Sequence, residues 1–463
     1  MSNERKVEAG ALLAEDAEQL AAATSQVLEL ALGRKLAAEV FLTASHSTRA
    51  IVQDGVVETF TLTEPQGMGI RVVDHGRTGY SYTESFSPDA LADALAAAAA
   101  NALIMPDAAA VELASFAAAP PFVESIYHPE LATIPVERKI ALALDLDQQT
   151  HDADARVKNV IATSYADTSV FLRIASTCGL DRNYWSSMAW LACQPLVFWD
   201  GQNKNYHMIR ATRRFAELDP SYMAKEAVRR CIEKLGARQL AASSYPVVFA
   251  PEAFAALLGA FCGIFSAKVA QEGKSLLRER LGQRSAATVF SLTDDPLIPG
   301  GLASRPFDDE GCPSRELPLI AAGFFQNFMH NSETARRDRV ASTGHAVRGS
   351  YKDTLRVGPS NLVVQAGQAS FQDLVSAAPQ VLHLTELTGL HAGTNVVSGD
   401  FSLPAQGFLY AGSERLPVHL ITVAGNFYRL LESIEAIGAQ SELLPSGIRT
   451  PAVLVAGLAI AGH

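Results

Sequence analysis

The sequence has few cysteines and no arrangement of them that would cross-link the chain. Five thiols occur in 463 residues, an odd number, and no two are spaced as Cys-x-x-Cys. A disulfide scaffold or a zinc ribbon needs paired cysteines at close spacing. The pattern therefore favours reduced thiols in a cytoplasmic protein, and the five residues are Cys178, Cys193, Cys231, Cys262 and Cys312.

Long apolar runs are also missing. No segment offers about 18 consecutive uncharged apolar residues, the length that a membrane-spanning helix needs. The opening stretch, MSNERKVEAGALLAED, mixes acidic and basic residues and contains no apolar core of signal-peptide length. Both absences predict a protein that has no membrane partner.

Positive charge is scarce as well. The chain carries 38 Lys and Arg against 49 Asp and Glu, which gives a formal net charge of −11. Proteins that coat nucleic acid need a basic surface to neutralise phosphates. The composition therefore disfavours nucleic acid as a partner, although a local basic strip would still be compatible with it.

Histidine pairs suited to a helical metal site are absent. Zinc hydrolases commonly place two histidines one helical turn apart, so that both imidazoles share one face. The closest of the eleven histidines, His383 and His391, are eight residues apart. The sequence thus predicts no metal ligands and no metal cofactor in this chain.

Common motifs for a catalytic nucleophile are also lacking. Neither a Gly-x-Ser-x-Gly elbow nor a Ser-x-x-Lys motif occurs. Cys262 lies in the apolar run LLGAFCGIF, where a core role is expected. Cys312 has a more polar context but no histidine partner that the sequence can identify. No catalytic residue is predicted, and an independent hydrolase that uses Cys312 or an acidic pair stays as an alternative.

Helical and strand patterns are both present, but they do not alternate regularly. This favours an α+β class over a doubly wound sheet. We expect two domains, an N-terminal mixed domain with antiparallel strands over 1–236 and a strand-rich, barrel-like domain over 245–463, joined near 237–246. Asp54-Gly55 and His75-Gly76 predict hairpin turns. Helices are expected over 14–32, 88–104, 136–150, 219–236, 251–265 and 425–437. Two or three long strands are expected within about 156–216, and single strands over 39–47, 49–55, 56–64, 246–250, 287–292, 318–325, 361–367, 380–387, 398–412, 418–425 and 450–462.

One acidic stretch, SRPFDDEGCPSRE (304–316), invites a functional interpretation. Adjacent carboxylates such as Asp308 and Asp309 point in different directions on a regular backbone, so they seldom share one ion. The spacing of a calcium loop is also absent. A turn in which Gly311 supplies an unusual backbone angle is the simplest interpretation, and contact with a ligand or partner stays open.

The second half resembles a known family. The acidic stretch is followed by LIAAGFFQNFMHNSETAR, ASTGHAVRGS and TNVVSGDFSLPAQGFLYAGSE, in the order found in the TldD/PmbA family, once labelled modulators of DNA gyrase. Paired members of that family form a cytoplasmic metalloprotease. The resemblance is strongest from about residue 245 onward, and the first half is similar in layout only.

The resemblance also shows where this chain departs from the family's catalytic branch. The TldD-like branch carries His-Glu-x-x-x-His in the helix after the strand that opens the C-terminal domain. An ungapped alignment places Gly259 and Ala260 where His-Glu would stand, and Ile264 where the second histidine would stand. The chain therefore resembles the TldE (PmbA) branch, and the resemblance implies zinc in a TldD-like partner only.

The resemblance implies a non-catalytic subunit of a TldD–TldE-like complex that degrades or matures unfolded peptides and small proteins. The expected partners are a TldD-like metal-bearing subunit and unfolded peptide substrates, and a homodimer is possible. Expected substrate or partner contacts are Asp308, Asp309, Glu310, Gly311, Ser342, Thr343, His345, Asn395, Ser398, Gly399, Asp400 and Phe401. The alternatives are a stand-alone homodimer that binds peptides without cutting them and a regulator that binds gyrase.

Overall fold

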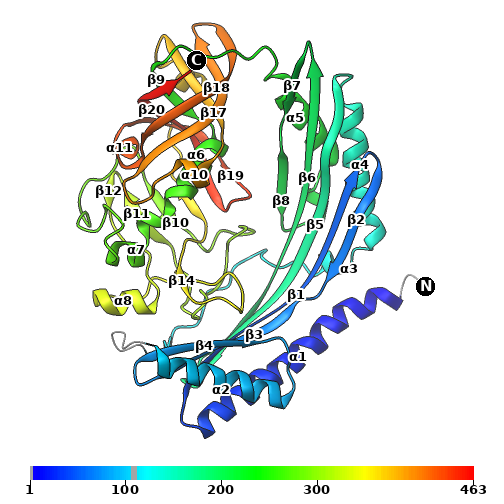
Figure 1. Ribbon diagram of the computed structural model, residues 1–463, viewed down its shortest axis with the longest axis vertical. Coiled ribbons are helices and arrows are strands. Elements are labelled where there is room, and N and C mark those ends of the chain that lie inside the picture. Colours follow the sequence, from blue (N-terminus) through cyan, green and yellow to red (C-terminus); the bar gives the residue numbers. More distant parts are fainter. Residues whose placement is uncertain (1–3, 106–111, 463) are drawn as a thin grey trace.

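The computed structural model describes residues 4–105 and 112–462. Two sheets dominate it, one built from residues 37–212 and the other from residues 243–461 (Figure 1). Both contain strands of very different length, and helices accompany each, which confirms the predicted α+β class. None of the helices in the described ranges has the length and apolar character that crossing a membrane requires.

The first sheet is antiparallel throughout. Its eight strands follow the order β4-β3-β1-β5-β6-β7, with β2 beside β1 and β8 beside β6. Positive φ angles at Asp54 and His75 form the two predicted hairpin turns. The two strands expected over 39–55 are one strand, because β1 runs without a break. The bounds are β1 Ala37–Gln53, β2 Val56–Thr63, β3 Gln66–Asp74, β4 Arg77–Thr83, β5 Val157–Ser176, β6 Asp181–Trp199, β7 Gln202–Asn205 and β8 Met208–Thr212.

Helices cover this sheet in two groups. Helices α1 and α2 pack at one end on β1, β3 and β4, while α4 and α5 pack on the long strands β5 and β6. Helix α2 begins where the sequence predicts, because the Ser87 hydroxyl caps it by accepting a hydrogen bond from the backbone N–H of Ala90. In Figure 1, α4 lies on the far side of β5 and β6 from the second sheet. The bounds are α1 Glu4–Gly33, α2 Pro88–Ile104, α3 Glu130–Thr133, α4 Val136–Asp152, η1 Phe215–Glu217 and α5 Pro220–Ile232.

The second sheet has ten strands and is mixed. Strand β9 pairs in parallel with β16 and antiparallel with β20, so β9, β16, β17, β18 and β20 form a ring of paired neighbours. The sheet also continues past this ring through β15, β10, β11 and β12, and the prediction of a barrel-like domain is not confirmed. The bounds are β9 Ser243–Phe249, β10 Leu292–Asp294, β11 Leu317–Ala321, β12 Phe324–Phe325, β15 Leu362–Val364, β16 Gln380–Leu387, β17 Asp400–Ala411, β18 Glu414–Asn426, β19 Ile434–Leu443 and β20 Ile448–Ala461; β13 Ala346–Val347 and β14 Arg356–Val357 form a separate pair.

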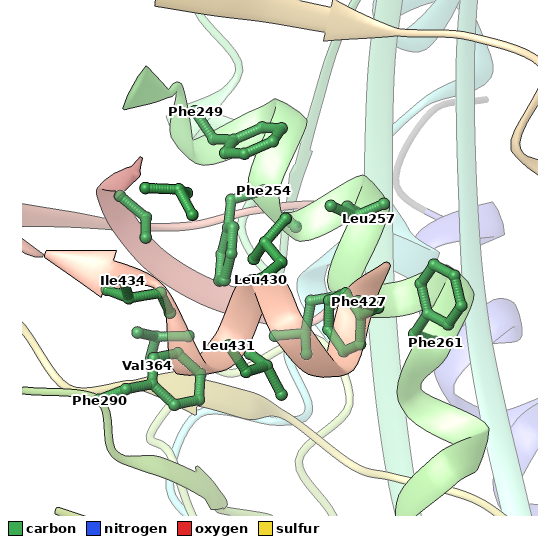
Figure 2. Close-up of a cluster of buried hydrophobic side chains, with 14 of the residues drawn as sticks. Phe249, Phe254, Leu257, Phe261, Phe290, Val364, Phe427, Leu430, Leu431 and Ile434 are labelled. Atoms are coloured by element: carbon green, nitrogen blue, oxygen red, sulfur yellow. The ribbon is translucent and has the colours of Figure 1, made fainter. Parts of the chain in front are cut away.

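Helix α6 fills the core beside this sheet. It is predominantly apolar, and its side chains Phe254 and Phe261 pack with Phe427, Leu430 and neighbouring residues (Figure 2). The helix predicted over 251–265 is therefore confirmed, ending as a 3-10 turn. The bounds are α6 Pro251–Phe261, η2 Cys262–Phe265, α7 Ala267–Gln271, α8 Ser332–Asp338, α9 Phe371–Val375, α10 Leu390–Gly393 and α11 Phe427–Glu432.

The strand predicted over 287–292 is wrong. The chain turns there, with the backbone N–H of Phe290 donating to the carbonyl of Ala287, and β10 begins only at Leu292. Val289 is half exposed while Phe290 is fully buried. The alternation of exposed and buried residues that suggested a strand comes from one buried phenylalanine in a turn.

Candidate functional site

The positions where the resemblance places zinc ligands lie on α6 and the 3-10 turn after it, against the apolar core. Gly259, Ala260 and Ile264 carry no metal-donor side chain, and Ile264 is fully buried. A Cβ added at Gly259 would contact Cδ1 of Ile448 at 3.5 Å. The neighbouring Phe261 ring stacks on Phe427 with centroids 4.6 Å apart (Figure 2). The residues present therefore do not fit a zinc ion.

Metal-donor side chains elsewhere in the described chain are dispersed. Within residues 4–105 and 112–462, no three His, Cys, Asp or Glu side chains gather closely enough to hold a metal ion. The three consecutive carboxylates of the acidic stretch form no such group either. Whether zinc belongs to a partner subunit stays a prediction.

The acidic stretch forms a buried turn. One Asp308 carboxylate oxygen accepts hydrogen bonds from the backbone N–H groups of Glu310 and Cys312, and the other accepts from Ala346. Gly311 adopts a φ of +79°, and a Cβ there would lie 2.7 Å from the Leu180 side chain. The predicted turn, including the unusual angle at Gly311, is confirmed.

This turn also joins the two halves of the molecule through buried charges. Arg71 on β3 reaches Glu310 at 3.2 Å and Glu39 at 2.6 Å, and Arg348 reaches the other oxygen of Glu39 at 2.6 Å. The backbone N–H of Arg348 donates to Asp309. Buried ions are tolerated only when paired in this way. The turn is therefore a structural joint between the first sheet and the second half.

Burial raises the pKa of two carboxyl groups in this joint. Burial, with the nearby Glu310 adding to it, raises the pKa of Asp308 to about 7. Burial likewise raises the pKa of Asp309. All three carboxylates are buried and hydrogen-bonded inside the chain. All three have partners inside the chain, and their contact with a substrate or partner stays a prediction.

Sequence reasoning missed Glu39 and Arg71, the residues that complete this joint. Each stands within a strongly apolar strand, AAEVFL and GMGIRVV, and each has an exposed fraction below 5%. Charged residues are seldom fully buried unless they are paired. A lone charge inside each apolar strand was the available sign that both would meet a partner.

The predicted contacts Thr343 and His345 form a hydrogen-bonded chain with Asp294. The Thr343 hydroxyl lies 2.9 Å from Nδ1 of His345, whose Nε2 lies 3.1 Å from Asp294. This order of groups is that of a nucleophile and its base, but the same hydroxyl accepts from the backbone N–H of His330 at 2.7 Å. The neighbouring Ser342 carbonyl accepts from Arg315, which ties the segment to the acidic turn. These hydrogen bonds stabilise the turn over residues 342–345.

The predicted contacts over residues 395–401 pack on the C-terminal end of α6. The Asn395 side chain accepts from the backbone N–H of Ser398, and Asp400 accepts from Asn426 at 2.8 Å. A Cβ at Gly399, where φ is +83°, would lie 2.4 Å from the Tyr428 ring. Phe401 is buried and edge-on to a core phenylalanine. The structure thus brings the predicted contacts at 308–311 and 342–345 together, whereas Asn395 and Asp400 are exposed elsewhere.

The thiol alternative gains no support from the geometry. Cys312 is buried, and burial raises the pKa of its thiol to about 12. A nucleophilic cysteine needs a lowered pKa and access to substrate. Cys312 therefore has the properties of a core thiol.

A groove of about 460 Å³ lies between the two halves. Strand β8 and the turn at Tyr206–His207 line one side, and the first turn of α6, the end of β16 and residues 442–446 line the other. In the described part of the chain β8 pairs with β6 alone, so its second edge is unpaired. The groove carries both signs of charge, from Arg210, Arg230, Glu226, Glu252, Glu386 and Glu442.

Comparisons with known families and curated proteins agree along the chain. Models of the PmbA/TldA metallopeptidase match over residues 38–102 (domain 1), 129–235 (central domain) and 242–462 (C-terminal domain). Two models divide the first half, so the description as two domains is not confirmed. The Metalloprotease PmbA of Escherichia coli O157:H7 is 28% identical over 95% of this chain and 96% of its own length. The Metalloprotease TldD homolog of Haemophilus influenzae is 24% identical over 92% of both.

Solved structures show the same fold. A protein of Thermotoga maritima, named a putative modulator of a DNA gyrase, is 26% identical with a TM-score of 0.88 over 96% of this chain and all of that one. TldE from Thermococcus kodakarensis is 22% identical with a TM-score of 0.86 over 95% of this chain and all of that one, which establishes the shared fold. The chain therefore belongs to the PmbA/TldD metallopeptidase family.

Proposed function

We propose that this chain is a non-catalytic, TldE/PmbA-type subunit of a metallopeptidase complex. The observation that carries the proposal is the apolar packing at Gly259, Ala260 and Ile264, where the catalytic branch would hold its zinc ligands. Relatives of both kinds, named PmbA and TldD, are similar to this chain along most of its length. A TldD-like partner would then supply the zinc and the attacking water.

The groove between the halves supports a role in holding unfolded peptides. An extended peptide can add a strand to an unpaired sheet edge, because main-chain hydrogen bonds give affinity without sequence preference. Strand β8 offers such an edge beside the groove. The subunit would present an unfolded substrate in extended form to the catalytic partner.

Co-expression with the TldD-like protein of the same organism tests the proposal. We expect the two chains to co-purify, an unfolded fluorescent protein substrate to be cleaved by the pair, and zinc to be found in the partner alone. Replacing the glutamate of the partner's His-Glu-x-x-x-His motif by glutamine serves as the matched control and should abolish cleavage by an otherwise intact pair. Stoichiometric zinc in the isolated chain, together with chelator-sensitive cleavage by it, would refute the assignment.

The same preparation separates the alternatives. A homodimer that binds unfolded peptides and ignores the TldD-like protein would favour a stand-alone binding protein. A regulator of gyrase, the role named for the Thermotoga relative, requires direct binding of the pure chain to gyrase. Cleavage by the isolated chain in the presence of a chelator would favour an independent hydrolase.

A further inference from the structure

A pocket of about 720 Å³ lies beside α7 and α8, apart from the groove between the halves. This volume is within the usual range for sites that take small ligands or peptide ends. Its lining comes from four separate stretches of chain, 270–281, 315–317, 327–330 and 338–343. Thr343 is the residue that this pocket shares with the predicted contacts.

One wall of the pocket contains a polar atom without a partner. The side-chain N–H group of Gln271 donates to the carbonyl of Thr334 at 2.8 Å, which fixes the orientation of the amide. Its Oε1 atom is buried and accepts no hydrogen bond from the described residues. A buried acceptor without a partner is unfavourable. The Oε1 atom is shielded from solvent, so a ligand would reach it only if neighbouring side chains moved.

Positive charge faces the same space. Arg278 lines the pocket as an exposed residue, and its guanidinium makes no ion pair or hydrogen bond with any residue that the structure describes. Arg315, also exposed, lines it too, with one N–H group donating to the Ser342 carbonyl. Asp338 is the acid of the lining, and burial lowers the pKa of the neighbouring His330, so that this imidazole is neutral at pH 7. The lining has a net positive charge in a strongly acidic protein.

The mouth of the pocket is apolar and uncovered. Leu281 and Val340 both line it, and each residue is more than half exposed to solvent. Phe328 and Leu317 continue the apolar surface inward. A bound water molecule would use neither the guanidinium groups nor this apolar surface.

We propose that the pocket binds the C-terminal end of a peptide whose last side chain is apolar. The terminal carboxylate pairs with Arg278 and Arg315, since guanidinium groups match carboxylates in geometry. The last side chain covers Leu281 and Val340. The idea rests on the proposed peptide-handling role and adds the feature by which this subunit selects a substrate.

Fluorescence anisotropy with the full-length chain tests the proposal without any partner subunit. The probe is the hexapeptide Gly-Ser-Gly-Ala-Ala-Leu, labelled with fluorescein at its amino end and carrying a free carboxylate. We expect it to bind at least tenfold more tightly than the same peptide with a terminal carboxamide. We expect R278M to remove this tenfold preference, whereas the matched variant R280M, on an exposed arginine outside the pocket, should retain it.

A second variant probes the apolar mouth and keeps both arginines. V340D places a carboxylate at the exposed rim and should weaken binding of the free-acid peptide at least tenfold, with unchanged circular dichroism. Equal binding of the acid and amide peptides, equal effects of R278M and R280M, or no binding at millimolar protein would each overturn the proposal. These outcomes leave the association with a TldD-like subunit unaffected, so the two ideas fail separately.

Discussion

The substitution R71M tests whether the acidic turn is a structural joint. Methionine keeps most of the volume of the arginine stem but removes the charge that bridges Glu39 and Glu310. Both carboxylates have side chains that are 1% exposed, so water cannot replace the lost partner. The variant isolates the charge from the packing.

The expected cost follows from what each carboxylate retains. Removing one partner of a buried ion pair usually destabilises a protein by about 3–5 kcal/mol. Glu39 keeps its contact with Arg348 at 2.6 Å, and Glu310 keeps the backbone N–H of Ser332 at 2.8 Å. We therefore expect a loss at the lower end, about 3 kcal/mol.

Urea unfolding followed by tryptophan fluorescence measures this loss, since all three tryptophans lie in the first half, at 185, 190 and 199. The matched control is R49M, which changes an exposed arginine of the same sheet and should shift stability by less than about 0.5 kcal/mol. Adding E310Q to R71M removes the unpaired charge and should recover part of the loss. A cost below about 1 kcal/mol for R71M would show that the charges do not hold the joint.

Three further predictions concern other parts of the chain. Burial, aided by Arg415, lowers the pKa of His383 to about 4, so the contribution of the neutral imidazole to stability is present above pH 6.5 and is lost as the pH falls toward 4. H383L should therefore reduce the loss of stability between pH 7 and pH 4 by about 2 kcal/mol, as measured by urea unfolding. An unchanged pH profile would contradict this. I264H should lower stability by about 2–4 kcal/mol because it buries an imidazole in the core, and mass spectrometry should find no zinc in the variant. G79A should cost about 2 kcal/mol or more in thermal unfolding, because the new Cβ would lie 2.0 Å from the carbonyl of Ala98, whereas G33A, with nothing within 4 Å, should be nearly neutral.

Local chemistry allowed part of the fold to be predicted from sequence. The helix that begins after Ser87 and the hairpin at Asp54-Gly55 depend on residues next to one another, and both formed as expected. The pairing of β9 with both β16 and β20 depends on strands more than 130 residues away in the sequence. Patterns within a short window contain no information about such pairing, which is why the barrel prediction was not confirmed.

The acidic turn and the pocket beside α8 show why the candidate site was harder to predict than the fold. Three consecutive carboxylates at 308–310 draw attention in a sequence, yet each has an internal partner, and their proximity reflects one tight turn. The pocket beside α8 takes its polar lining from Gln271, Arg278 and Arg315, which are dispersed and individually ordinary. What distinguishes them is that two exposed guanidinium groups and a glutamine with a buried, unpartnered oxygen line one pocket. Only the three-dimensional structure reveals that these residues lie together.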